Sequence, residues 1–158
     1  MIDTQDNALT ATEFEMMAHD EGVRYFVYDD ATGAPIVKGY TLKGNPTIGI
    51  GRNLASEGIT AEEVSLLLAG DWSKVVKVAE QYDWFKILDP VRAYVVCNMI
   101  FNLGANGFAQ FKSFQSFLER GLWEGAANSM MQSIWAREVP NRAAELHNMM
   151  LTGELAKP

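Results

Sequence analysis

Paired cysteines, long apolar runs and an excess of basic residues are all missing from this 158-residue chain. No run approaches the roughly 18 apolar residues of a membrane-spanning helix, so insertion into a membrane is not expected. Cys97 is the single cysteine, which excludes an internal disulfide. It lies in an apolar run, 94–97, where we expect a buried and unreactive thiol.

The charge balance is acidic, with 13 Lys and Arg against 20 Asp and Glu and a formal net charge of −7. A nucleic-acid-binding module normally carries a basic patch, so no nucleic-acid partner is expected. The chain contains 2 His and a single Cys, and no cluster of them has the spacing of metal ligands, so we expect no metal. The run Gly49-Ile50-Gly51 lacks the further glycine and the following helix of a dinucleotide site, so no cofactor is expected.

The first ten residues are polar and lack the positively charged start and apolar core of a secretion signal. We expect residues 1–10 to form an N-terminal tail, with no signal peptide. A chain of 158 residues is long enough to bury a sizeable core as one unit, so a single domain over 1–158 is expected.

The hydrophobic pattern changes along the chain. Thr10 and Glu13 form a capping box, and apolar residues follow at helical spacing as far as Gly22, which predicts a helix over 11–21. Segments rich in β-branched and aromatic residues then predict strands within 23–28, 36–42 and 47–51, separated by turn signals. Together they predict a small antiparallel sheet over about 23–51.

Capping signals predict helices through the remainder of the chain. Thr60 with Glu63 opens one helix, Asp71 is expected to cap a second, and Asp89-Pro90 caps a third that ends near Gly104. Three more are predicted, over about 107–120, over 122–135, and from Pro140 to about Thr152-Gly153. The order predicts an α+β protein, with a small β-sheet lobe, a larger mainly helical lobe and a ligand-binding groove between them.

Two carboxylates, Glu21 and Asp30, flank the predicted sheet. Hydrolysis of a glycosidic bond needs an acid that protonates the leaving oxygen and a carboxylate that guides a water molecule or attacks the sugar. The partial negative charge at a helix C-terminus favours the protonated form of Glu21, whereas the nearby Arg24 acts in the opposite direction. From spacing alone, a Glu at a helix end and an Asp in a turn are most often solvated surface residues, so spacing does not assign catalysis.

A resemblance is more specific. Several motifs resemble the active-site signature of the T-even phage lysozymes, glycoside hydrolase family 24: Asp20-Glu21-Gly22, Tyr28, Asp30 and Thr47-Ile48-Gly49-Ile50-Gly51. Glu21 and Asp30 keep the family's nine-residue step. Further similar stretches follow in the family's order, at 98–104, 123–127, Trp135, 140–143 and 151–153. The resemblance covers most of residues 13–155.

The resemblance implies a muramidase that hydrolyses the β-1,4 bond between N-acetylmuramic acid and N-acetylglucosamine in peptidoglycan. Glu21 would be the general acid, Asp30 would position or activate the attacking water, and Thr47 would hold that water. Direct attack by water would invert the anomeric carbon.

Other roles are implied in the same way. Arg142 would be a cation near Glu21. Phe101, Asn102 and Asn53 would contact the sugar, although Phe101 is equally consistent with core packing. A monomer is expected, acting on glycan strands.

Two departures from the family pattern stand out. Sixteen residues separate Asp30 from Thr47, where the family has five, and the extra segment is predicted to form a longer hairpin or flap. Arg52 stands where the relatives have His. A surface ion pair is favoured for Arg52 over a contact with sugar or peptide.

Two other functions remain open. A lytic transglycosylase would use the muramic acid's own hydroxyl in place of water and release 1,6-anhydro ends. A non-catalytic peptidoglycan-binding or virion module could use the same scaffold. If the protein is a phage endolysin, we expect it in the host cytoplasm until lysis releases it to the cell wall; a tail-associated or prophage lysozyme fits the same sequence.

Overall fold

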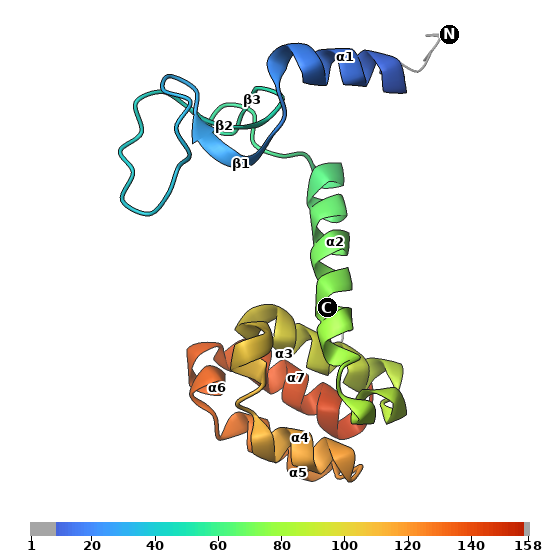
Figure 1. The fold of residues 1–158 in the computed structure, drawn as a ribbon. Coiled ribbons are helices and arrows are strands. Elements are labelled where there is room, and N and C mark those ends of the chain that lie inside the picture. The colour runs from blue at the N-terminus through green and yellow to red at the C-terminus, as the bar shows by residue number, and fades with distance from the viewer. Residues whose placement is uncertain (1–8, 157–158) are drawn as a thin grey trace, which may run out of the picture. The chain divides into compact units, whose positions relative to one another are not determined.

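The computed structural model describes residues 9–156 (Figure 1). The chain divides into two compact units, residues 1–64 and 65–158, and each is described by itself. Of the predicted N-terminal tail, only Leu9 and Thr10 fall within the described residues. The expectation of a single domain stays a prediction.

The first unit contains helix α1 (Ala11–Glu21) and strands β1 (Arg24–Asp29), β2 (Pro46–Gly49) and β3 (Arg52–Asn53). The Thr10 hydroxyl accepts a hydrogen bond from the Glu13 N–H at 3.2 Å, and Glu13 Oε2 accepts one from the Thr10 N–H at 2.8 Å. This reciprocal capping box confirms the predicted start of α1. Gly22, at φ 73°, ends the helix, because its N–H bonds to the Ala18 carbonyl in a conformation that L side chains rarely adopt.

The sheet is antiparallel, in the order β1-β2-β3. Its register pairs Arg24 with Gly49, Tyr28 with Thr47, and Thr47 with Asn53. The prediction of a small antiparallel sheet is therefore confirmed.

The strand predicted within 36–42 was wrong. That segment is a loop, and its neighbourhood contributes a single bridge, between Tyr28 and Pro35. Val37 and Leu42 are exposed, so the β-branched pattern has no buried face to cover. The loop is organised instead by the buried carboxylate of Asp29, described below.

The second unit is helical and begins within α2 (Ala61–Ala79). It continues with the 3-10 helix η1 (Asp83–Ile87) and with α3 (Pro90–Phe108), α4 (Lys112–Glu119), α5 (Trp123–Met131), α6 (Ile134–Glu138) and α7 (Pro140–Thr152). A sheet in one unit and helices in the other make the fold α+β.

Four boundaries differ from prediction. The helix expected over about 107–120 begins only at Lys112, as α4. Asp71 does not cap a new helix: α2 runs through it, and its side chain pairs with Lys74. The helix predicted over 122–135 is two helices, because the Ser133 hydroxyl accepts the N–H of Ala136 and starts α6. Gly104, at φ 70°, interrupts α3 as expected, but helical structure resumes to Phe108.

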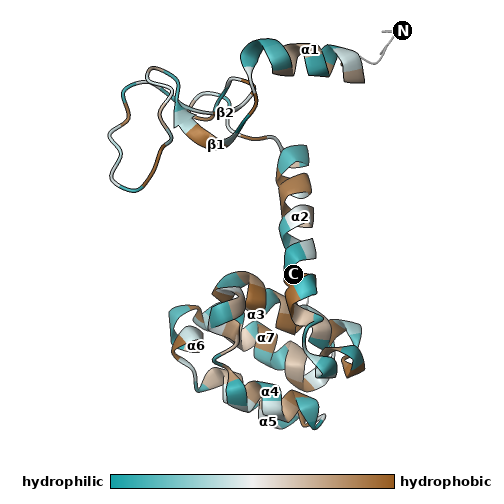
Figure 2. Ribbon diagram, in the orientation of Figure 1, coloured by the Kyte–Doolittle hydropathy of each residue, from teal (hydrophilic) through white to brown (hydrophobic). Residues whose placement is uncertain are grey.

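The helical unit contains every fully buried apolar side chain of the described residues. Figure 2 shows hydrophobic stretches on α3 and α7, which contribute much of this core. Cys97 is buried there as expected, beside Met99 and Met150, whereas Met16 and Met17 of α1 are exposed. Within the described residues, no helix is both long and apolar enough to cross a membrane.

Arg92 joins helices that are distant in sequence. Its Nε donates to the Met150 carbonyl at 2.8 Å, one terminal nitrogen donates to the Leu151 carbonyl at 3.1 Å, and another pairs with Asp89. The guanidinium also lies 4.8 Å from the centre of the Trp123 ring. One side chain therefore ties the start of α3 to α5 and to the end of α7.

Candidate functional site

Asp29 anchors the loop that joins β1 to β2. Its buried carboxylate accepts hydrogen bonds from the backbone N–H groups of Ala31 at 3.0 Å, Lys43 at 2.7 Å and Gly44 at 3.0 Å, and from the Tyr40 hydroxyl at 2.9 Å. Burial alone raises the pKa of Asp29, but these four donors outweigh it and hold the pKa below its ordinary value. Asp29 is an ionised structural carboxylate that binds both ends of the loop.

Asp30, the next residue, is exposed, and it is held by Asn45. The Asn45 backbone N–H donates to Asp30 Oδ1 at 2.7 Å, and its side-chain amide donates to Oδ2 at 3.0 Å. Both bonds lower the pKa of Asp30 from its ordinary value, and the backbone bond has the larger effect. Asp30 is therefore suited to act as an ionised carboxylate, not as a proton donor.

Thr47 lies in the middle strand and is buried. Its hydroxyl donates to the Asn45 carbonyl at 3.2 Å, and the same carbonyl accepts the Asp30 N–H at 3.1 Å. The structure thus brings Asp30 and Thr47 together through Asn45. Because the Thr47 hydrogen is used for this bond, the hydroxyl oxygen can take part in a further hydrogen bond only as an acceptor.

Sequence reasoning missed Asn45, which looked like an ordinary turn residue before Pro46. The signal that could have found it is the strand register. Asp29 pairs with Pro46 in the antiparallel ladder, so residue 45 lies opposite residue 30.

Glu21 is the last residue of α1 and its side chain is exposed. Gly22 and Val23 alone separate it from β1. Its role as the acid stays a prediction.

Asn53 and Arg52 form β3. The Asn53 side-chain oxygen accepts the N–H groups of Ala55 at 2.9 Å and Ser56 at 3.2 Å, so it stabilises the turn after the strand. Arg52 pairs with Glu63 at 2.8 Å, which confirms the ion-pair interpretation. The sugar contact expected for Asn53 stays a prediction.

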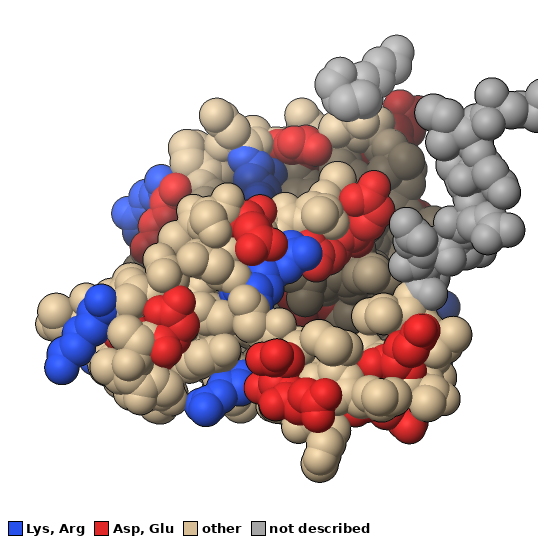
Figure 3. Space-filling model, turned by 90° about the horizontal axis from the view of Figure 1, so that it is seen from above, with Lys and Arg blue, Asp and Glu red and all other residues tan. Residues whose placement is uncertain are grey.

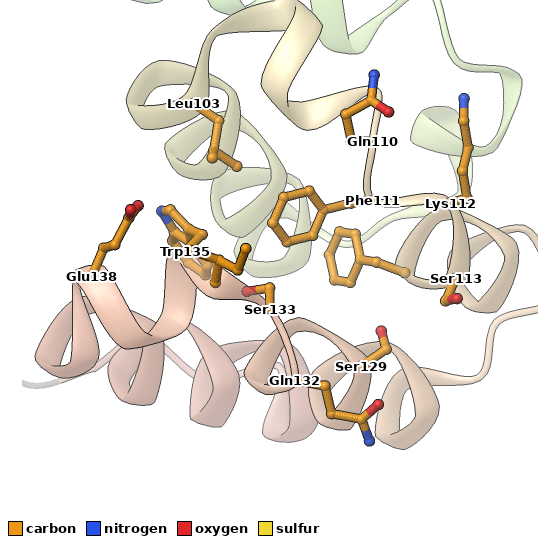
Figure 4. Close-up of a pocket in the computed structure, with 12 residues that line it drawn as sticks. Leu103, Gln110, Phe111, Lys112, Ser113, Ser129, Gln132, Ser133, Trp135 and Glu138 are labelled. Atoms are coloured by element: carbon orange, nitrogen blue, oxygen red, sulfur yellow. The ribbon is translucent and has the colours of Figure 1, made fainter.

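Asn102 lies in the helical unit and is exposed on α3. Its side-chain oxygen accepts the Trp135 indole N–H at 2.6 Å. Trp135 and Phe111 line a recess of about 510 Å³, with Lys112 and Glu138 at opposite sides of the view in Figure 4. Asn102 is therefore bonded to a residue that lines this recess, and the sugar contact expected for Asn102 stays a prediction.

Phe101 and Arg142 line another recess of about 510 Å³ in the same unit, together with Trp72, Tyr94 and Asn98. Phe101 is 47% exposed, and its ring centre is 6.4 Å from that of Trp72. Phe101 is therefore at the edge of the core and not inside it. Proximity of Arg142 to Glu21 stays a prediction, because the two residues belong to different units.

No group of three or more potential metal-ligating side chains occurs among residues 9–156. Figure 3 shows acidic side chains scattered over the face in view, with Lys and Arg between them.

Comparison with known proteins finds no protein-family profile that matches the chain. Three curated relatives align with most of it. The pre-baseplate central spike protein Gp5 of Enterobacteria phage T4 is 27% identical over 173 positions, with 98% of this chain aligned but only 30% of the spike protein. Two proteins of Dictyostelium discoideum, probable T4-type lysozymes 1 and 2, are 27% and 23% identical, each with 89% of this chain and 94% of the relative aligned.

The aligned region therefore includes both the sheet-containing unit and the helical unit. The α+β order of one helix, a small antiparallel sheet and then helices agrees with a lysozyme-like fold. Over nearly its whole length, the chain is similar to the phage-type lysozymes.

Proposed function

We propose that the protein is a muramidase that hydrolyses the β-1,4 bond between N-acetylmuramic acid and N-acetylglucosamine in peptidoglycan, with inversion by direct attack of water. One observation carries the proposal. An ionised Asp30 and the hydroxyl of Thr47 are linked through one residue, in a chain similar to T4-type lysozymes that also has Glu21 nine positions before Asp30.

The hydrogen bonds suggest how water is held. Each Asp30 oxygen accepts one bond from Asn45 and keeps a further acceptor position, and the Thr47 oxygen acts as an acceptor because its hydrogen points to the Asn45 carbonyl. A water that donates one hydrogen to each has a lone pair free to attack the anomeric carbon. As the water attacks, Asp30 takes one of its protons, and Glu21 gives its own proton to the leaving sugar oxygen as the glycosidic bond breaks.

The remaining predicted residues bind the glycan in this proposal. Asn53 from the sheet and Asn102 from the helical unit are polar contacts to sugar hydroxyl or acetamido groups. Phe101, which is about half exposed, contacts a sugar ring. Arg142 is the cation that accompanies Glu21.

The decisive variant is Glu21→Gln, which keeps the size of the side chain and removes its acidic proton. We expect clearing of purified cell walls to fall by a factor of about 100 or more, the usual contribution of general acid catalysis. Glu15→Gln is the matched control, because Glu15 is another exposed glutamate of α1. Unchanged clearing by Glu21→Gln would refute the assignment of the acid.

Product analysis separates the hydrolase from its alternatives. Hydrolysis leaves reducing ends on the muramic acid, and a newly released α-anomer identifies inversion. 1,6-Anhydro ends would show a lytic transglycosylase instead. Tight wall binding without any cleavage would favour a non-catalytic binding module.

A further inference from the structure

We propose that Asn45 is a positioning residue that orients the Asp30 carboxylate and the Thr47 hydroxyl together. The inference rests on the proposed function, in which these two groups hold the attacking water. Neither the motif resemblance nor the named relatives assign a role to this position.

Four hydrogen bonds meet at Asn45. Its backbone N–H and its side-chain amide each bind a different oxygen of Asp30, at 2.7 Å and 3.0 Å. Its carbonyl accepts the Asp30 N–H at 3.1 Å and the Thr47 hydroxyl at 3.2 Å. A shift of this one residue therefore moves both proposed water ligands.

The side-chain bond has a specific geometric effect. The last torsion of an aspartate is broad and roughly two-fold, so its rotamer preference does not fix the plane of the carboxylate. A single donor to one oxygen leaves the carboxylate plane free to turn about the Cβ–Cγ bond. A second donor from the same residue on the other oxygen fixes the plane, and with it the remaining acceptor directions.

Gly44, the residue before Asn45, packs closely against the Asp30 carboxylate. A Cβ on Gly44 would lie 2.1 Å from Asp30 Oδ1, so the backbone of residue 44 occupies the space beside that oxygen. Asp29 holds residues 43 and 44 in turn through their N–H groups. The long loop thus returns to Asp30 and delivers Asn45 in a defined position.

Asn45 itself is exposed, so truncating its side chain opens no cavity in a core. A role limited to loop stability would therefore produce a small loss of stability and no specific change in catalysis. A positioning role predicts instead a specific loss of catalytic rate in a variant that stays folded. Two variants test it: Asn45→Ala removes the side-chain donor, and Asn45→Asp keeps the shape but places a second negative charge beside Asp30.

We expect Asn45→Ala to lower kcat about tenfold with little change in KM, because the water ligands are misoriented while the sugar contacts remain. In the parent the Asn45 amide favours the ionised form of Asp30, so its removal raises the pKa of Asp30. The acidic limb of the kcat–pH profile should therefore move to higher pH. Asn45→Asp should move it further. The matched control is Tyr40→Phe, which removes the hydrogen bonds of this hydroxyl with Asp29 and Thr32 in the same loop and deletes none of the hydrogen bonds to Asp30.

The inference is overturned if Asn45→Ala retains the kcat and acidic limb of the parent, or if Tyr40→Phe reproduces its effects. A second measurement is independent of catalysis. Titration of the Asp30 carboxyl carbon by NMR should give a midpoint that rises in the order parent, Asn45→Ala, Asn45→Asp, and an unchanged midpoint would refute the contact. Parent-like activity of Glu21→Gln would instead remove the proposed function, while the titration would still test Asn45.

Discussion

Adding a single methyl group at Gly44 should impair the proposed site. The new Cβ of Gly44→Ala would lie 2.1 Å from Asp30 Oδ1, more than 1 Å inside the 3.4 Å at which ordinary contact begins. It would also lie 2.7 Å from the Cβ of Ala31 and 2.8 Å from its backbone nitrogen. Rotating the Asp30 side chain relieves only the first clash, so the backbone must move as well.

The size of the effect follows from that displacement. Overpacking of this kind costs about 1–3 kcal/mol of unfolding free energy. A misplacement of about 1 Å in a catalytic group lowers a rate by a factor of about 100. We therefore expect a modest loss of stability and a loss of kcat of about two orders of magnitude.

The assay compares kcat on purified peptidoglycan with urea unfolding, at a temperature where the variant is folded. Gly70→Ala is the matched control, because a Cβ at this position of α2 meets nothing within 4 Å. It should retain activity and gain about 0.5–1 kcal/mol of stability, as glycine in a helix interior is unfavourable. If Gly44→Ala matched the parent in both kcat and stability, the close approach to Asp30 would be disproved.

Three further predictions concern the helical unit. Gly125→Ala should lower the free energy of unfolding by about 1–3 kcal/mol, because its Cβ would lie 2.5 Å from Cδ1 of Phe117; a parent-like urea transition would contradict this. Burial raises the pKa of Asp89, but its bonds to Arg92 lower the pKa by more, so the folded-state pKa lies below the unfolded-state value of about 3.9. The ionised Asp89 therefore stabilises the fold above that unfolded-state pKa. This stabilisation is lost as the pH falls through the folded-state pKa. Unfolding from about pH 6 to pH 2 should therefore show a steeper acid loss in the parent than in Asp89→Asn, and equal slopes would refute the linkage. Burial is the larger cause, and the charge of Glu80 the smaller, of a Cys97 pKa raised to about 11. Only about one thiol in a thousand is therefore ionised at pH 8. A thiol reagent should modify Cys97 no faster than the protein unfolds.

Much of the helical structure could be predicted because its signals are local. Thr10 with Glu13, Asp89 before Pro90, and Gly153 after the last helix each satisfy or terminate a helix within four residues. Asp71 shows the limit of such reasoning. It is an acceptable cap by type, but α2 continues through it.

The loop between β1 and β2 could not be predicted from local pattern. Residues 36–42 have the composition of a strand, yet the Asp29 carboxylate binds donors that lie up to 15 positions away. A tertiary anchor of this kind replaces the ladder that a strand would need. A prediction from local sequence pattern does not include hydrogen bonds between residues so far apart in the chain.

The candidate site was predicted in part. The motif resemblance identified Asp30 and Thr47, which the structure links, and Glu21, which stays a prediction. Asn45 escaped notice because its relation to Asp30 depends on strand register, which no single motif encodes.

The contacts of Arg92 bear on how the protein folds during its synthesis. The carbonyls that it binds belong to residues 58 and 59 positions later in the chain, so these two partners become available only when α7 has left the ribosome. The helical unit of an unfinished chain therefore lacks the hydrogen bonds that tie the start of α3 to the end of α7. Nascent chains stalled before Met150 should consequently be far more sensitive to protease than chains released after it.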